Sequence, residues 1–204
     1  MRKHIAVGAA LALGFGTQVF AADEGFSYNL GEIGYTRSEI DDLDLKGDGV
    51  TLGGSVEFAP NIFGSFNFAD VDYGSSAATA GVKIKGTTYS LGVGSHWALG
   101  PKLDLVSGVT YEHVKVKGSS GGISASDSES GFGLNAGLRG RAGDQLELTG
   151  TIKYVNFGHG ADDFTFGAGG RWYFTEAFAA GPDVSHNDDG THWGISFRYD
   201  FGKR

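Results

Sequence analysis

Large apolar residues alternate with small or polar residues along the run 191–201, near the end of the chain. Polar positions such as Arg198 and Asp200 fall between the apolar ones. The apolar positions are Trp193, Ile195, Phe197, Tyr199 and Phe201. Because successive side chains of an extended strand point to opposite faces, this run predicts a β-strand with one apolar and one polar face.

The same period of two recurs along the chain and predicts about ten strands, with eight as the alternative. The apolar phase slips around Gly31, which predicts a β-bulge there. Pro182 cannot donate a hydrogen bond to a neighbouring strand, so we expect it at a strand end or a bulge. The expected strands span 26–37, 49–58, 62–72, 83–97, 103–116, 131–141, 146–156, 164–174, 177–185 and 191–201.

The expected connections alternate between short and long. The short ones lie near 59–61, 98–102, 142–145 and 175–176. The longer ones are rich in Gly, Ser and Asp and lie near 38–48, 73–82, 117–130, 157–163 and 186–190. This asymmetry is typical of a closed, antiparallel, up-and-down transmembrane β-barrel with short periplasmic turns and longer extracellular loops.

The start of the chain reads as a secretory leader. Arg2, Lys3 and His4 precede an apolar stretch at 5–15 that is too short to cross a bilayer as a helix. Small residues around Ala21 predict cleavage after that position. We therefore expect a cleaved signal peptide at 1–21 and a single barrel domain at 22–204.

Composition narrows the class of protein further. The chain of 204 residues has no cysteine, so export brings no disulfide framework. Without Arg2 and Lys3 it has 14 basic and 24 acidic residues, a net charge of −10, which argues against nucleic acid as a partner. No stretch after the leader is apolar for long enough to form a membrane helix.

Charge decides which face of the predicted sheet is wet. The ionisable side chains within the strands share the small and polar face. If that face were a dry core, each unpaired charge would cost several kcal/mol, roughly, whereas a hydrated lumen imposes little cost. The apolar face is therefore expected to meet lipid. The predicted lumen-lining charges are Glu57, Glu112, Arg139, Arg141, Glu147, Lys153, Arg171, Arg198 and Asp200.

Three stretches carry a resemblance to a known class of protein. The segments 26–35, 48–58 and 62–66 resemble small outer-membrane β-barrel proteins of the porin-like superfamily, and the similarity covers essentially the mature chain. The nearest branch is the diffusible-signal-factor-regulated barrel family. The resemblance implies a bacterial outer-membrane location and no settled activity. It also implies that the last strand, with Trp193, Ile195, Phe197, Tyr199 and Phe201, is the signal for the barrel-assembly machinery, although Gly202-Lys203-Arg204 follow it.

Acidic residues gather in the expected outer loops. One interpretation is a divalent-cation site that includes Asp42, Asp44 and Asp48 and bridges phosphates of lipopolysaccharide. However, Lys46 and Gly53 occupy positions where a calcium loop needs ligands, so the favoured interpretation is charged, solvated loops and no bound metal.

An enzyme is the second interpretation of the barrel. Asp70 or Asp72 near a strand end, with His113, His159 or His186, could activate water as in an outer-membrane protease or a lipid A hydrolase. The chain contains no nucleophile elbow and no HExxH motif, so we predict no catalytic residues and no cofactor.

The favoured function is a structural or surface-interacting barrel with at most a narrow channel for ions or small solutes. Arg139 or Arg141 is expected to face Glu147 across a short turn and plug the lower lumen, since barrels of this size are nearly filled by side chains. The expected partners are outer-membrane lipid and lipopolysaccharide, and the expected state is a monomer. A secreted soluble barrel that binds a ligand is the third alternative.

Overall fold

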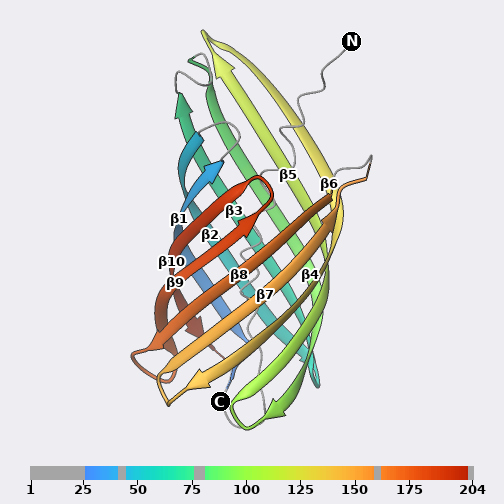
Figure 1. The fold of residues 1–204 in the computed structure, drawn as a ribbon, viewed down its shortest axis with the longest axis vertical. Coiled ribbons are helices and arrows are strands. Elements are labelled where there is room, and N and C mark those ends of the chain that lie inside the picture. Colours follow the sequence, from blue (N-terminus) through green and yellow to red (C-terminus); the bar gives the residue numbers. More distant parts are fainter. Residues whose placement is uncertain (1–25, 41–44, 76–80, 159–161, 202–204) are drawn as a thin grey trace.

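The computed structural model describes residues 26–40, 45–75, 81–158 and 162–201. Ten strands form one closed barrel in which each strand pairs with its sequence neighbours and β1 pairs with β10 (Figure 1). The strands are β1 (Leu30–Ile40), β2 (Leu45–Ala59), β3 (Ile62–Ser75), β4 (Lys83–Gly100), β5 (Leu103–Ser120), β6 (Ile123–Ala142), β7 (Leu146–Asn156), β8 (Asp162–Tyr173), β9 (Phe178–Asn187) and β10 (Gly190–Asp200). The predicted closed antiparallel barrel is confirmed, with ten strands and not eight. Within the described ranges, no helix is both long and apolar enough to cross a membrane.

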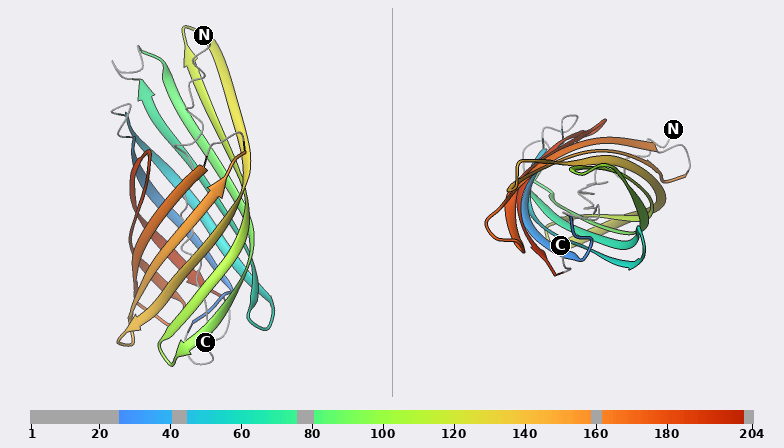
Figure 2. Two further views of the ribbon diagram at one scale, coloured as in Figure 1. Left: turned by 45° about the vertical axis from the view of Figure 1, so that its right-hand side comes forward. Right: turned by 90° about the horizontal axis from the view of Figure 1, so that it is seen from below.

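The barrel has unequal ends. The turns after β2, β4, β6 and β8 are short and lie together at one end, which we call the inner end. At the opposite, outer end, β4, β5 and β6 are 18, 18 and 20 residues long and rise beyond the other strands (Figure 2). The expected loop at 117–130 is therefore wrong, since only Gly121 and Gly122 separate β5 from β6. Both have positive φ, of 57° and 86°, which suits glycine in a tight hairpin.

The predicted bulge at Gly31 is also wrong. The β1 ladders with β2 and β10 run without a register shift from Leu30 to Ile40. Residues 26–29 precede the strand, and Phe26 and Tyr28 are buried inside the barrel at its inner end. The apolar phase changes because these aromatic residues face the interior, whereas Ile33 and Tyr35 face outward.

An aromatic row crosses the outward face of three strands. Phe68 on β3, Tyr89 on β4 and His113 on β5 are cross-strand partners, with ring centroids 6.1 and 5.2 Å apart. On the inner-end side of this row, the outward positions of β5 are mainly apolar from Leu103 to Tyr111. Nine residues match the length of a strand that crosses a bilayer, so the aromatic row marks the outer edge of the lipid-facing belt.

Polarity changes sides beyond the aromatic row. On β5 the outward residues there are Lys115 and Lys117, whereas Val114 and Val116 point inward. An apolar cluster consequently fills the inside of the barrel at the outer end. It consists of Ile40, Leu45, Ala69, Val71, Tyr73, Val114, Val155 and Phe157, with Ile84 and Val116 packed against it. The expected arrangement, apolar outward and polar inward, holds along the lipid-facing belt and reverses above it.

Candidate functional site: an ion-pair layer across the barrel

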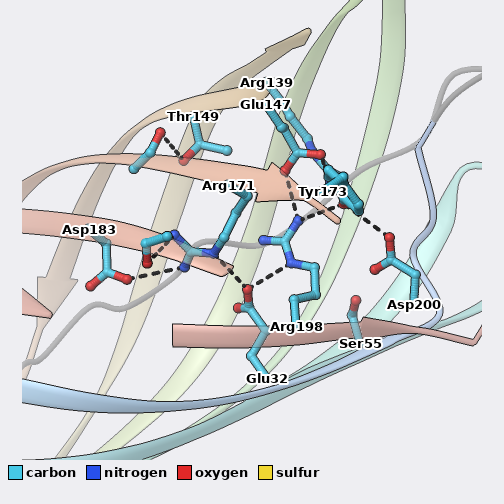
Figure 3. A network of polar contacts seen from close by, with 12 residues as sticks. Glu32, Ser55, Arg139, Glu147, Thr149, Arg171, Tyr173, Asp183, Arg198 and Asp200 are labelled. Atoms are coloured by element: carbon cyan, nitrogen blue, oxygen red, sulfur yellow. Dashed lines mark hydrogen bonds and ion pairs between the residues drawn. The ribbon is translucent and has the colours of Figure 1, made fainter. Parts of the chain in front are cut away.

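Charged side chains from six strands meet inside the barrel (Figure 3). Glu32 on β1 lies between two arginines. Its Oε1 accepts hydrogen bonds from Nε of Arg198 at 2.7 Å and from Nε of Arg171 at 3.3 Å. Because β1 and β10 close the barrel, this carboxylate links the first strand of the chain to two of its last three strands.

Arg171 also donates hydrogen bonds to backbone carbonyl groups where the β8–β9 ladder is interrupted. The β8–β9 ladder is interrupted between the pairs Gly169–Asp183 and Trp172–Ala180, next to Pro182. Nη1 of Arg171 donates to the carbonyl oxygens of Pro182 at 3.1 Å and Gly181 at 3.4 Å. Pro182 therefore lies within a strand, where a ladder irregularity accommodates its missing N–H, and an arginine satisfies the carbonyl groups.

A second carboxylate completes the layer. Oε1 of Glu147 on β7 accepts a hydrogen bond from Nη1 of Arg198 at 2.7 Å, and its Oε2 pairs with Nη2 of Arg139 on β6. The hydroxyl of Tyr173 donates to Glu147 at 3.2 Å or to Asp200 at 3.0 Å. Arg139, Arg198 and Glu147 are each at most 1% exposed, so their charges are balanced by ion pairs with one another and with Glu32.

We call this set the ion-pair layer. Its members are Glu32, Arg139, Glu147, Arg171, Tyr173, Asp183, Arg198 and Asp200, and Asp183 joins it through an ion pair of 3.1 Å with Arg171. The Phe26 ring lies next to this layer on the side of the inner end. The guanidinium carbons of Arg139 and Arg141 lie 4.5 and 4.8 Å from the centroid of the Phe26 ring, which is cation–π geometry.

A smaller polar group lies on the other side of the interior. Nζ of Lys153 on β7 is 2.7 Å from Glu112 on β5, which also accepts a hydrogen bond from Ser90 at 2.9 Å. Towards the inner end, Glu57 is 3.8 Å from Nε2 of His96. His96 is nearly buried, and its ring is 4.0 Å from that of Tyr28.

The structure brings several of the predicted lumen-lining charges together. Arg139, Glu147, Arg171, Arg198 and Asp200 share the ion-pair layer. Arg141 is the strand partner of Glu147 across the β6–β7 hairpin. Glu112 pairs with Lys153 in the smaller group, and Glu57 is only partly buried.

Sequence reasoning missed Glu32, Asp183 and Tyr173. Glu32 lies directly after the position where a bulge was expected, so its face was left unassigned. Asp183 follows Pro182 in the weakest strand pattern. Tyr173 is an aromatic residue at an inward position, which the rule of apolar residues facing lipid does not anticipate. The sequence signal for Glu32 was its position two residues before Gly34 and four before Thr36, on the small and polar face of β1.

The comparisons with known proteins agree with this architecture. The family profile described as outer membrane protein beta-barrel domain matches residues 7–201. The chain belongs to this outer-membrane β-barrel family. It lies in the bacterial outer membrane, where its exposed aliphatic and aromatic belt meets lipid. The soluble-barrel alternative is therefore wrong.

Solved structures share the barrel. Ail, the attachment invasion locus protein of Yersinia pestis, is 19% identical, covering 84% of this chain and 97% of that one, with a TM-score of 0.50. The N-terminal barrel domain of Pseudomonas aeruginosa OprF is 10% identical over 85% and 99% of the two chains, with a TM-score of 0.46. The KdgM porin is 11% identical over 84% and 99%, with a TM-score of 0.47. Among curated proteins, none matches the chain. At 19% identity, the likeness to Ail concerns the fold alone.

Of the three residues considered for calcium, the structure describes only Asp48. Asp42 and Asp44 lie outside the described residues. Asp48 accepts a hydrogen bond from the Tyr35 hydroxyl and pairs with Arg37 at 3.3 Å. No group of three potential metal ligands occurs in the described parts of the chain.

The residues considered for hydrolysis are occupied elsewhere. Asp70 pairs with Lys85 at 2.7 Å and Asp72 with Lys83 at 2.9 Å. His113 is 2.8 Å from the hydroxyl of Ser130, and the other described candidate, His186, is 3.0 Å from that of Thr191. His159 lies outside the described residues. The geometry thus offers no Asp–His pair among the described candidates.

Proposed function

We propose that this outer-membrane protein is a structural and surface-interacting barrel whose interior is closed, or passes at most ions and small solutes. The observation that carries the proposal is the ion-pair layer, in which buried, mutually paired side chains from six strands cross the lumen. The apolar cluster at the outer end adds a second obstruction, because a dry apolar constriction opposes the passage of ions.

Single-channel recording of the refolded protein in planar bilayers tests the closed interior. We expect no openings, or openings far smaller than those of a general porin. The variant Glu32→Ala/Glu147→Ala removes both carboxylates that bridge the arginines, and it should increase conductance or noise. A matched control, Glu176→Ala, changes an exposed carboxylate in the β8–β9 turn and should leave the recording unchanged. Porin-sized openings in the unmodified protein would overturn the proposal.

A surface role is supported by lysines directly above the lipid-facing belt. On the outward face beyond the aromatic row, Lys85 and Lys117 are cross-strand partners, and Lys115 lies nearby on β5. Lys115 and Lys117 form no ion pair with the described residues, whereas Lys85 pairs with Asp70. At this height the anionic phosphates of lipopolysaccharide are the natural counter-charges, since basic residues near an anionic membrane surface each contribute about 1 kcal/mol.

The double variant Lys115→Gln/Lys117→Gln tests lipopolysaccharide contact. We expect lipopolysaccharide to raise the unfolding midpoint of the unmodified barrel in vesicles, and to raise it less in the double variant. In vesicles of phosphatidylcholine alone the two proteins should unfold alike. Lys102→Gln, at an exposed position of the inner end, is the control. An equal lipopolysaccharide effect on all three proteins would contradict the lysine contact.

The last strand also has a proposed partner. Trp193, Ile195, Phe197 and Tyr199 face outward along β10, as an assembly signal read by the barrel-assembly machinery would require. The proposal includes a monomeric state, membership of the diffusible-signal-factor-regulated branch and no catalytic activity. The branch is supported by the resemblance of the segments quoted above, and the lack of catalytic activity by the other partners that engage Asp70, Asp72, His113 and His186.

A further inference from the structure

The hairpin of β5 and β6 leaves one strand edge open. β6 pairs with β5 from Ile123 to Gly140, but with β7 only from Phe132 to Ala142. Along 123–130, the edge of β6 that faces away from β5 therefore has no strand partner among the described residues. Figure 1 shows this part of β6 rising beyond the end of β7. Backbone N–H and C=O groups on such an edge are a template for another extended chain.

A pocket lies beside this edge on the inward face. Its volume is about 540 Å³, and its floor is apolar, formed by Val82, Ile84, Val114 and Val116. The size falls within the range of pockets that bind small molecules or a few side chains. Because these residues lie beyond the aromatic row, the pocket opens above the lipid-facing belt, where water and not lipid surrounds the chain.

Two carboxylates border the pocket. Asp127 and Glu129 are cross-strand partners of Val116 and Val114, so they share the inward face with the apolar floor. Neither forms an ion pair with a described basic group, and Asp127 accepts only the backbone N–H of Ser128 in the described chain. The lysines of this region point to the opposite face, so the pocket side carries unbalanced negative charge.

Charge selects the partner of the open edge. If two copies of this chain paired through 123–130, their carboxylates would approach one another, and like charges on adjacent strands are destabilising. A strand in which every second residue is basic would instead point all its cations to the inward face, where their aliphatic stems cover the apolar floor and their ammonium groups lie beside the carboxylates. We propose that the open edge of β6 binds an extended, basic, amphipathic polypeptide segment by strand addition.

The probe is an eight-residue peptide in which Val and Lys alternate, labelled for fluorescence anisotropy. The full-length barrel is reconstituted in phosphatidylcholine nanodiscs, and empty nanodiscs give the background. We expect saturable binding with new protection from amide hydrogen exchange along 123–130. Asp127→Asn/Glu129→Gln should weaken binding by about 2- to 30-fold, the range for losing two opposite-charge cross-strand pairs.

Matched controls separate strand addition from general attraction. Lys115→Gln/Lys117→Gln changes two charges on the opposite face and should not weaken binding. A peptide with Glu in place of Lys, and a Lys peptide with Pro in place of alternate Val, should both bind poorly, because one lacks the charge and the other cannot form the ladder. Equal binding of either control peptide, or unchanged hydrogen exchange along 123–130, would overturn the proposal. The test is independent of whether the barrel conducts.

Discussion

Removing the carboxylate of Glu147 should destabilise the barrel more than any other single loss of charge at its inner end. Glu147→Ala leaves Arg198 with Glu32 as a partner at 2.7 Å, but it takes from Arg139 the ion pair with Glu147. Removing one partner of a buried pair costs about 3–5 kcal/mol. Because Arg198 keeps its other carboxylate, we expect the lower end of this range, about 3 kcal/mol.

Urea unfolding in phospholipid vesicles measures this loss. The natural reporters are Trp97, Trp172 and Trp193, which all face lipid and are 46–48% exposed. With a urea dependence of about 1–3 kcal/mol per molar, the midpoint should fall by about 1–3 M. Glu147→Gln, which keeps an acceptor for Tyr173, should lose less.

The control for this experiment is Glu176→Ala, which alters an exposed carboxylate of the β8–β9 turn and should stay within about 0.5 kcal/mol of the unmodified protein. If Glu147→Ala stayed within that same margin, the ion-pair layer would contribute no stability, and hydration of its arginines would have to replace the lost pair.

Three further predictions follow from packing and hydrogen bonding. Arg171→Lys keeps the charge but loses the forked donors to Gly181 and Pro182, so unfolding free energy should fall by about 1–3 kcal/mol and amide exchange along β9 should speed up. Gly94→Ala would force a methyl group into the buried ring of Phe63 and should cost about 1–3 kcal/mol in the urea assay, whereas Gly150→Ala meets open space and should be nearly neutral. Gly122→Val imposes a β-branched side chain at φ 86° and should destabilise the β5–β6 hairpin, seen as faster exchange there and not along β9.

Alternation predicted the strands, and together with the connection lengths and the placement of charge it predicted the closed barrel and its lipid-facing belt. Along β10, each apolar residue of the period of two faces outward, because lipid on one side leaves only the polar face for the interior. Where water contacts both faces of a strand, polar residues occur on both faces, so the alternation that predicts a strand is absent. Residues 117–130 are rich in Ser and Gly on both faces, so they read as a loop although they pair strand to strand.

The partners within the ion-pair layer required the closed barrel. Glu32 meets Arg171 and Arg198 across separations of 139 and 166 residues, and those contacts exist only because β1 pairs with β10. Arg139 and Glu147 are 8 residues apart on one hairpin, which is why sequence reasoning could place them near each other. Asp183 was not predicted as a lumen-lining residue because Pro182 beside it weakens the strand pattern of that segment.

The change of polarity beyond the aromatic row explains why alternation predicted side-chain orientation correctly within the lipid-facing belt and incorrectly above it. A side chain faces lipid, lumen or external water according to its height as well as its parity. Val109 and Lys117 share one face of β5, yet only Val109 lies within the lipid-facing belt. Val116 points inward with Glu112, yet it packs against an apolar cluster and Glu112 pairs with Lys153.

Since the belt is about nine to eleven residues long, a strand of 18 residues must leave it. The excess length of β4, β5 and β6 is therefore where the barrel gains a surface that lipid does not cover, and where contact with other molecules is expected.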